Sequence, residues 1–299
     1  MTTAYSTFNL SYTNAVPYLT VAEFTSAPTA LDLTNLVSNG TPAQQVNAIA
    51  EVIQRASSAM DSYVFGAWGT MSATVNTENG RIYGDRMGRF RVHPKYWPVL
   101  EVQSFSYSFT PGDATSITPA NNVWIEPHAF VVQPSGTVGF GLNVPSNIGT
   151  YEYLCEWTYV NGWPNTLTAA SVAAGASSVT VQSAVGIYPG TSLQIYDSPN
   201  DETITVASTY AVGSTTLPLT SPVARRHAAG ISVTNLPGVV KQAAILWTSA
   251  LIKQRGSAAL VINDLGETQA ATSHDAGRDA DIVMAMELLD PLRTIALGY

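Results

Sequence analysis

The sequence is poor in charged residues and contains a single cysteine. Only 11% of its 299 residues are charged, whereas 45% are hydrophobic. Such a chain can build sizeable cores and is long enough for two domains, so extensive disorder is not expected. The lone thiol, Cys155, excludes an internal disulfide. Because it lies in a strand-like segment between Tyr153 and Trp157, we expect it to be buried and unreactive.

Long apolar runs and an apolar leader are also missing. No stretch of roughly eighteen apolar residues occurs, which argues against a membrane-spanning helix. The first residues lack the basic start and apolar core of a signal peptide. We therefore expect a soluble protein that is made in a reducing compartment and has no membrane partner.

Motifs for catalysis or cofactor binding are absent too. The sequence has no glycine-rich phosphate loop, no nucleophile elbow and no pair of CxxC motifs. Asp197 to Glu202 contains three carboxylates among turn-forming residues, which favours a solvated turn over a cation site. No histidine has a second ligand at metal spacing, so each is interpreted as a solvated or hydrogen-bonded side chain. The histidines are His93, His128, His227 and His274. The sequence thus contains no complete catalytic constellation, and we expect no cofactor.

Positive charge is scarce and unevenly spread. The chain has 13 basic and 21 acidic residues, a formal charge of -8, which argues against a general nucleic-acid coat. Five of the basic residues fall within fifteen positions, interleaved with aromatic residues: Arg81, Arg86, Arg89, Arg91 and Lys95. This basic stretch is either a contact for DNA phosphates or an acidic partner, or a solvated hairpin with arginines paired to Glu78 or Asp85.

Helical periodicity is strongest between Thr41 and Val64. Thr41 can cap a helix, Pro42 suits its first position, and Gln44 completes a capping box. Apolar residues then recur at helical spacing over about six turns, so one face must be buried. Further helices are predicted near 20–27, 237–255 and 279–290, with Gly256 ending the third. Together they predict a small helical bundle in which 41–65 packs against 237–255.

The segment between these helices is β-prone. Strands are predicted at Thr70–Val75, Val123–Val132, Thr137–Val144 and Tyr151–Tyr159, and Asn79-Gly80 is a hairpin turn signal. This region from 70 to 160 forms the predicted β-rich segment.

The composition changes after residue 165. A turn and strand at Gly175–Ser183 are echoed 38 residues later at Gly213–Ser221. We interpret 166–235 as an inserted all-β module, and assign 1–165 and 236–299 to a helical core with a β-rich segment. The predicted fold class is α+β.

Several segments follow one another in a recognisable order. They are the short helix at Thr20, Ala56–Tyr63, Pro98–Val102, Pro237–Ala244, Ile252–Ser257 and Glu287–Arg293. In this order the chain resembles the head-to-tail connector (adaptor) proteins of long-tailed bacteriophages, in particular the longer members from phages of actinobacteria. The resemblance covers most of 17–165 and 235–299. The module at 168–236 departs from it, because compact members of the family lack such a module.

The resemblance implies a structural virion protein without enzyme activity. It implies a ring of identical subunits, dodecameric by resemblance, that binds beneath the portal protein and joins it to the next connector or a tail-terminator protein. Genomic DNA would pass transiently through the ring. The protein would be assembled in the host cytoplasm and reside in the virion neck, at the head–tail interface.

The end of the chain is a candidate docking segment. Four of its last eight residues are apolar, Leu292, Ile295, Leu297 and Tyr299. So short a segment gains most by docking on the portal or a neighbouring subunit. Fraying, or packing on its own subunit, is the alternative.

Two other functions stay open. One is a minor tail or decoration protein whose β module binds carbohydrate, for which only Tyr188, Tyr196 and Tyr210 could supply an aromatic groove. The other is a metal-dependent hydrolase that uses His274, Asp275 and a further carboxylate.

Overall fold

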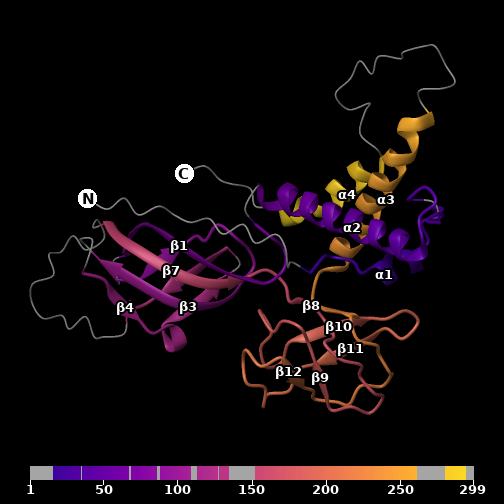
Figure 1. Ribbon diagram of the computed structural model, residues 1–299. Helices are drawn as coiled ribbons and strands as arrows, with labels where there is room; N and C mark the ends of the chain where they lie inside the picture. Colours follow the sequence, from indigo (N-terminus) through magenta and orange to yellow (C-terminus); the bar gives the residue numbers. More distant parts are fainter. Residues whose placement is uncertain are drawn as a thin grey trace, which may run out of the picture.

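The computed structural model describes residues 16–34, 36–66, 69–85, 88–108, 113–126, 128–134, 152–260 and 280–293. In these ranges the protein has four α-helices and several antiparallel sheets, which confirms the predicted α+β class. Figure 1 shows the helices gathered together and the strands in two separate groups. We call these groups the large β region, residues 74–161, and the small β region, residues 165–234.

The first two helices begin at the predicted capping boxes. In α1 (Val21–Ser26), the Thr20 hydroxyl accepts from the Glu23 amide while the Glu23 carboxylate accepts from the Thr20 amide. Thr41 and Gln44 form the same reciprocal pair at the start of α2 (Pro42–Phe65). Each box satisfies two backbone amides that the first turn of a helix leaves without partners. The local sequence therefore fixes where both helices start.

The third helix is longer than predicted. α3 spans Gly238–Leu260, so the prediction that Gly256 ends it was wrong. A glycine inside a helix costs only about 1 kcal/mol relative to alanine, and the strong helix formers Ala258 to Leu260 follow it. α4 (Ala280–Leu289) continues into the short 3-10 helix η4 (Asp290–Leu292).

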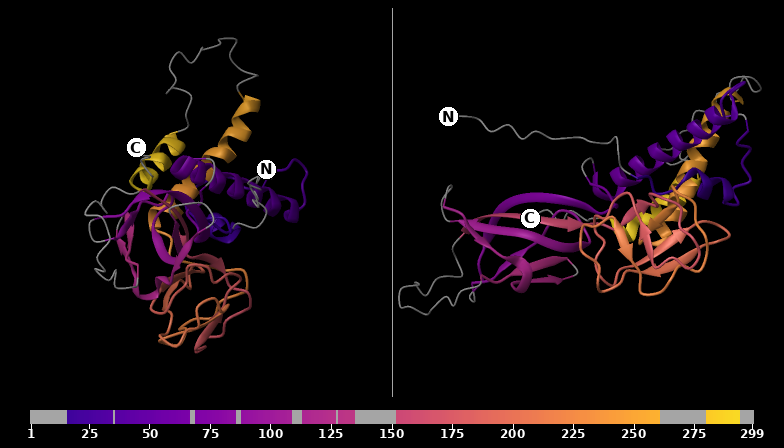
Figure 2. Two further views of the ribbon diagram at one scale, coloured as in Figure 1. Left: turned by 90° about the vertical axis from the view of Figure 1, so that its left-hand side faces the viewer. Right: turned by 60° about the horizontal axis from the view of Figure 1, so that its bottom comes forward.

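The helices share one hydrophobic core. α2 packs against α3 and α4, and Figure 2 shows the same helices side by side in two further views. Buried side chains come from all four helices and from the segment before α1; they include Tyr18, Phe24, Ile53, Met60, Val240, Ala243, Ala285 and Leu289. Leu246, on the predicted contact face of α3, is only half-buried. The apolar stripe of α2 thus finds its partner in segments far away in the sequence.

The large β region consists of two antiparallel sheets. One has the order β1 (Thr74–Tyr83), β7 (Glu152–Asn161), β3 (Val99–Ser108) and β4 (Thr115–Ile117). The other has the order β2 (Phe90–Val92), β6 (Ala129–Val132) and β5 (Val123–Glu126), with the short 3-10 helix η2 (Pro119–Asn121) preceding β5. Phe90, Phe105, Phe130, Trp157 and Tyr159 belong to the core of this region.

Three local predictions in this region were wrong. The strand predicted at Thr70–Val75 begins only at Thr74, as part of β1. Asn79 and Gly80 lie inside β1, opposite Glu156 and Cys155, rather than in a hairpin turn. A Cβ on Gly80 would lie 3.2 Å from the Trp157 ring, so the glycine makes room for a neighbouring side chain. The segment 123–132 forms the hairpin β5–β6 rather than one strand. Residues 137–144 lie outside the described residues.

The small β region is built from two similar halves. Its four-stranded sheet has the order β11 (Glu202–Thr205), β10 (Ser192–Tyr196), β13 (Ser232–Thr234) and β8 (Asn165–Leu167). A second, two-stranded sheet pairs β12 (Thr216–Pro218) with β9 (Ser178–Thr180). Val179 pairs with Leu217, its counterpart 38 residues later. The bond from the Val181 amide to the Thr215 carbonyl is matched by one from Leu219 to Ser177. The sequence echo therefore corresponds to a pseudo-two-fold axis between β9 and β12.

The helical core should be sensitive to a cavity on α2. Ile53 is 1% exposed, so Ile53→Ala should lower the free energy of unfolding by about 2 to 5 kcal/mol, as buried aliphatic truncations do. Leu246→Ala should cost less because that side chain is half-buried. Urea unfolding followed by circular dichroism measures both, with Val46→Ala, 48% exposed on the same helix, as the control. Equal stability of the Ile53 and Val46 variants would contradict the packing described.

Candidate functional site

The basic stretch is largely neutralised by neighbouring carboxylates. Its described arginines each form an ion pair: Arg81 with Glu152 at 2.9 Å, Arg89 with Asp85 at 2.7 Å, and Arg91 with Glu126 at 2.5 Å. The Lys95 ammonium lies 5.2 Å from the centre of the Tyr96 ring. Arg86 lies outside the described residues. These ion pairs leave less free positive charge for a phosphate backbone than the sequence suggests.

Glu78 has a structural role instead of pairing with an arginine. Its carboxylate accepts hydrogen bonds from the Tyr159 hydroxyl and from the Lys95 amide. Burial, together with the Glu78 carboxylate, raises the pKa of Tyr159 well above its ordinary value, so the phenol remains a donor. This contact fixes the bend at Lys95 against β7.

The predicted docking segment begins inside the fold. Leu292 lies in η4 and packs, partly buried, against the helical core of its own chain, as in the alternative that the sequence left open. The Tyr63 hydroxyl donates to Asp290 at 2.5 Å, and the Arg293 guanidinium lies 4.7 Å from the Tyr63 ring centre. These contacts hold η4 on α2. Ile295, Leu297 and Tyr299 lie outside the described residues.

His227 is the main site residue that sequence reasoning missed. It was interpreted as isolated, but it is 0% exposed and lies between two carboxylates. Nδ1 is 2.9 Å from Asp197 Oδ2, and Nε2 is 2.5 Å from Glu202 Oε1. Each ring nitrogen thus lies within hydrogen-bond distance of a carboxylate oxygen, so the ring bridges the two carboxyl groups. The turn at 197–202, predicted to be simply solvated, is therefore one half of a buried charged cluster.

Glu202 ties this cluster to the backbone of the loop that carries His227. Its oxygens also accept from the amides of Ala224 at 2.8 Å and Arg225 at 3.1 Å. Burial disfavours the ionised carboxylate, but the hydrogen bonds from His227 and the two amides outweigh it, so the pKa of Glu202 lies below its ordinary value. The sequence contained a signal for this cluster, because residues 166–235 hold only one histidine and three carboxylates.

A second buried ion pair joins the helices to the small β region. Lys241 of α3 is 6% exposed, and its Nζ donates to Glu23 Oε1 at 2.5 Å and to Ser232 Oγ at 3.0 Å. The ammonium also lies 4.5 Å from the Tyr196 ring centre. Burial lowers the pKa of Lys241, against the attraction of Glu23. One ammonium thus holds together α1, α3, β10 and β13.

Asp61 is a buried carboxylate that links three segments. It accepts hydrogen bonds from the Tyr18 hydroxyl and from the Met71 amide, and Thr70 bonds the same hydroxyl. Burial raises the pKa of Asp61 to about 6, despite the donors that stabilise its charge. A raised carboxyl pKa is also found at catalytic sites. Here the bonding partners attach the segment before α1 and the segment after α2 to each other.

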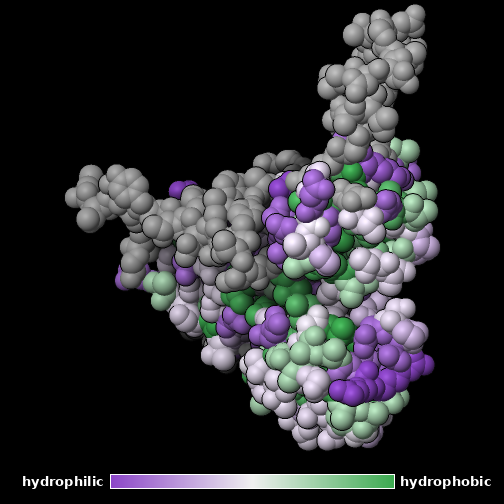
Figure 3. Space-filling model, turned by 45° about the vertical axis from the view of Figure 1, so that its right-hand side comes forward, coloured by the Kyte–Doolittle hydropathy of each residue, from purple (hydrophilic) through white to green (hydrophobic). Residues whose placement is uncertain are grey.

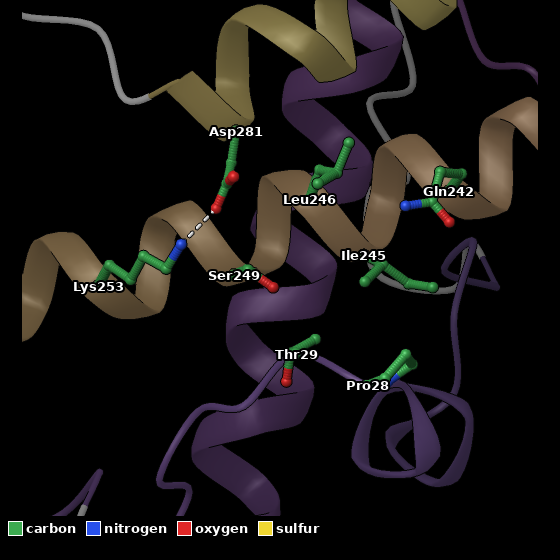
Figure 4. A pocket seen from close by; sticks show the side chains of 8 residues that line it. All are labelled: Pro28, Thr29, Gln242, Ile245, Leu246, Ser249, Lys253 and Asp281. Carbon is green, nitrogen blue, oxygen red and sulfur yellow. Dashed lines mark hydrogen bonds and ion pairs between the residues drawn. The ribbon is translucent and has the colours of Figure 1, made fainter.

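A small pocket lies along α3, as Figure 4 shows. It encloses about 240 Å³ and is lined by Pro28, Thr29, Gln242, Ile245, Leu246, Ser249, Lys253 and Asp281. Its two charged side chains bind each other, with Lys253 Nζ 2.6 Å from Asp281 Oδ2. The pocket is smaller than the roughly 300 to 1,000 Å³ typical of ligand sites, and the ion pair occupies its charged end.

The three tyrosines proposed for carbohydrate binding do not form one groove. The Tyr188 hydroxyl donates to Glu101 of β3 at 3.0 Å, and Tyr196 faces Lys241. Tyr210 is 5% exposed, and its hydroxyl donates to the Ser214 carbonyl. Each ring serves a different internal contact, so the structure offers no support for the carbohydrate-binding alternative at these residues.

The described residues contain no group of three His, Cys, Asp or Glu side chains arranged to hold a metal ion. His274 and Asp275 lie outside them. Burial raises the pKa of the Cys155 thiol to about 12, as expected for an unreactive cysteine. Within the same ranges, no helix has the length and apolar character that crossing a bilayer requires.

Comparison with known proteins identifies no relative of this chain. No protein family matches it, and no curated protein or solved structure does either.

The Lys241–Glu23 pair should be strongly coupled. Lys241→Met leaves the Glu23 carboxylate buried without its partner, which should lower the free energy of unfolding by about 3 to 5 kcal/mol. Glu23→Gln combined with Lys241→Met should recover part of that loss, since no unpaired charge remains. Urea unfolding of the single and double variants measures the coupling. Strictly additive effects would contradict a direct interaction.

Asp61 should make stability depend on pH. Its folded pKa, about 6, lies above its ordinary value of 3.8, so between these values the native state binds more protons than the unfolded state. The free energy of unfolding should therefore fall as pH rises from 4 to 6, by up to about 3 kcal/mol from this group. Asp61→Asn removes the titration, and the difference between variant and parent should change across that range. Parallel stability curves for the two proteins would rule this out.

Proposed function

We propose that this protein is a structural virion protein, a head-to-tail connector that forms a ring beneath the portal of a long-tailed bacteriophage. One observation carries the proposal. Helices from both sides of the β regions, α1 and α2 before them and α3 and α4 after them, close a single hydrophobic core. The resemblance implies this order of helices, β-rich segment and returning helices. In this proposal, the helices are the bundle that forms the body of the ring.

The small β region fits the role of an inserted module. Its first and last strands are neighbours, with Asn165 paired to Thr234. The Asn235 amide and the Thr234 hydroxyl both donate to the Pro164 carbonyl, at 2.9 and 2.8 Å. Neighbouring entry and exit points are what insertion into a host fold requires. We therefore assign 166–235 to an inserted module, with 1–165 and 236–299 as the connector core.

The charge distribution is compatible with a channel for DNA. An acidic chain with most described arginines already paired would let DNA pass without retaining it. The proposed lasting partners are further copies of the chain, the portal protein and the next connector or tail-terminator protein. The place of action would be the virion neck, after assembly in the host cytoplasm.

The direct test is electron microscopy of the full-length protein and of the virions that contain it. The expected results are closed rings with a central channel, and antibody label at the junction of head and tail. Label confined to the tail tip or capsid surface, with a chain that never forms rings, would overturn the proposal.

The segment after Arg293 should be needed for assembly rather than folding. Truncation after Arg293 keeps η4, the Tyr63–Asp290 hydrogen bond and the packing of Leu292. Thermal stability should therefore change little, whereas incorporation into virions should be lost because the docking segment is missing. Truncation after Leu289, which also removes η4, is the comparison and should lower stability. Normal incorporation of the chain that ends at Arg293 would show that the segment has no docking role.

A further inference from the structure

The small β region concentrates all of its charge at one place. Residues 166–235 contain only five charged side chains and no lysine: Asp197, Asp201, Glu202, Arg225 and Arg226. They fall in two loops that His227 and Glu202 bind together. In Figure 3, most of this region is weakly coloured, apart from one strongly hydrophilic patch. We call the two loops, 197–202 and 221–230, the charged pole.

The pseudo-two-fold axis relates loop 221–230 to loop 183–190, which contacts residues outside the small β region. Matched backbone bonds, Gly190 to Val206 and Gly230 to Thr168, end the loops 183–190 and 221–230 in the same way. Loop 183–190 packs on the large β region. A Cβ on Gly186 would lie 3.0 Å from Leu100 Cδ1 of β3, and Tyr188 donates to Glu101 of the same strand. Its counterpart, 221–230, presents exposed arginines instead. The same scaffold thus offers a second loop, which stays exposed among the residues that the structure describes.

Most polar groups of the charged pole are satisfied internally. Asp197 and Glu202 bind His227, and the Arg225 guanidinium donates to the Pro199 carbonyl at 2.6 Å. Arg226 is exposed, and no ion pair within the described residues involves it. Asp201 is also exposed; one of its oxygens accepts from the Asp197 amide at 2.7 Å, and a carboxylate has capacity for more donors. Arg226 and Asp201 therefore remain available on the same clamped surface, beside an Arg225 whose guanidinium is held by a backbone carbonyl.

The signs of the charged side chains in the pole indicate which kind of partner it can bind. The pole holds carboxylates beside its arginines, so it lacks the concentrated positive charge that binding a polyanion such as nucleic acid needs. A purely acidic protein surface would satisfy Arg226 but would repel Asp201. A partner that presents a negative and a positive charge at matching positions satisfies both groups. The same pole on another copy presents such a pair of charges.

We propose that the charged pole binds the charged pole of a second copy of this chain around a two-fold axis. Arg226 of each copy faces Asp201 of the other, which makes two identical ion pairs. The exposed neighbours Ser198, Ala224 and Ala228 are small, so the two loops can approach closely. The inference goes beyond the proposed ring, because this contact pairs two chains and does not depend on ring closure.

Charge reversal tests the pairing on the full-length chain. Arg226→Asp alone, or Asp201→Arg alone, places like charges across both contacts, and each should weaken self-association at least about tenfold. Mixing the two variants places opposite charges at positions 226 and 201 across both contacts and should restore association. A chain that carries both substitutions should also associate. Sedimentation velocity at several protein and salt concentrations measures this, with circular dichroism as the check on folding.

Arg55→Asp is the matched control. Arg55 is an exposed arginine of α2 outside the pole, paired with Glu51 at 3.5 Å, so its reversal should leave association unchanged. The proposal is overturned if the parent chain is monomeric at all concentrations, or if the mixture associates no better than either variant alone. It is also overturned if Arg226→Asp weakens, and Asp201→Arg strengthens, binding to a short DNA duplex while neither alters self-association. Rings that persist in both variants would leave the connector proposal standing and restrict the failure to the pole.

Discussion

The arrangement of helices and small β region depends on one buried ammonium group. Lys241 is surrounded by Glu23, Ser232 and Tyr196, which come from a helix at the start of the chain and from two strands of the small β region. A buried charge is tolerated only where its partners are in place. Any displacement of the small β region relative to α1 and α3 would leave Lys241 or Glu23 without a partner. The ion pair therefore specifies one orientation among the many that apolar packing alone would allow.

Charged residues are scarce in this protein, and they have different roles in the two β regions. In the large β region, arginines and carboxylates form exposed pairs that contribute little stability. In the small β region, the same residue types are gathered around a buried histidine and clamp two loops. A surface of small polar and apolar side chains elsewhere suits a protein that works through extended contacts with other subunits. This distribution is compatible with the structural role that we propose.

Local signals in the sequence predicted the helices well and the strands less well. Capping boxes at Thr20 and Thr41 are contacts between residues three apart, so the sequence contains both partners. The Asn79-Gly80 pair has the composition of a turn, but the strand runs through it because Trp157 needs the space above Gly80. Trp157 is 77 positions away from that glycine, and no local pattern could reveal the contact. The candidate site shows the same limit, since His227 and its carboxylates are 25 and 30 positions apart.

The sequence by itself determined the starts of α1 and α2, the apolar stripe of α2, the repeat in the small β region and the shortage of charge. Each of these is a matter of composition or of neighbours within a few turns or strands. Only the tertiary structure decided that the two repeats pair about an axis, that His227 lies buried between two carboxylates, and that Leu292 packs against the helical core. These outcomes depend on which distant segments share a buried volume, where an unpaired charge is costly and a partner must be supplied by the fold.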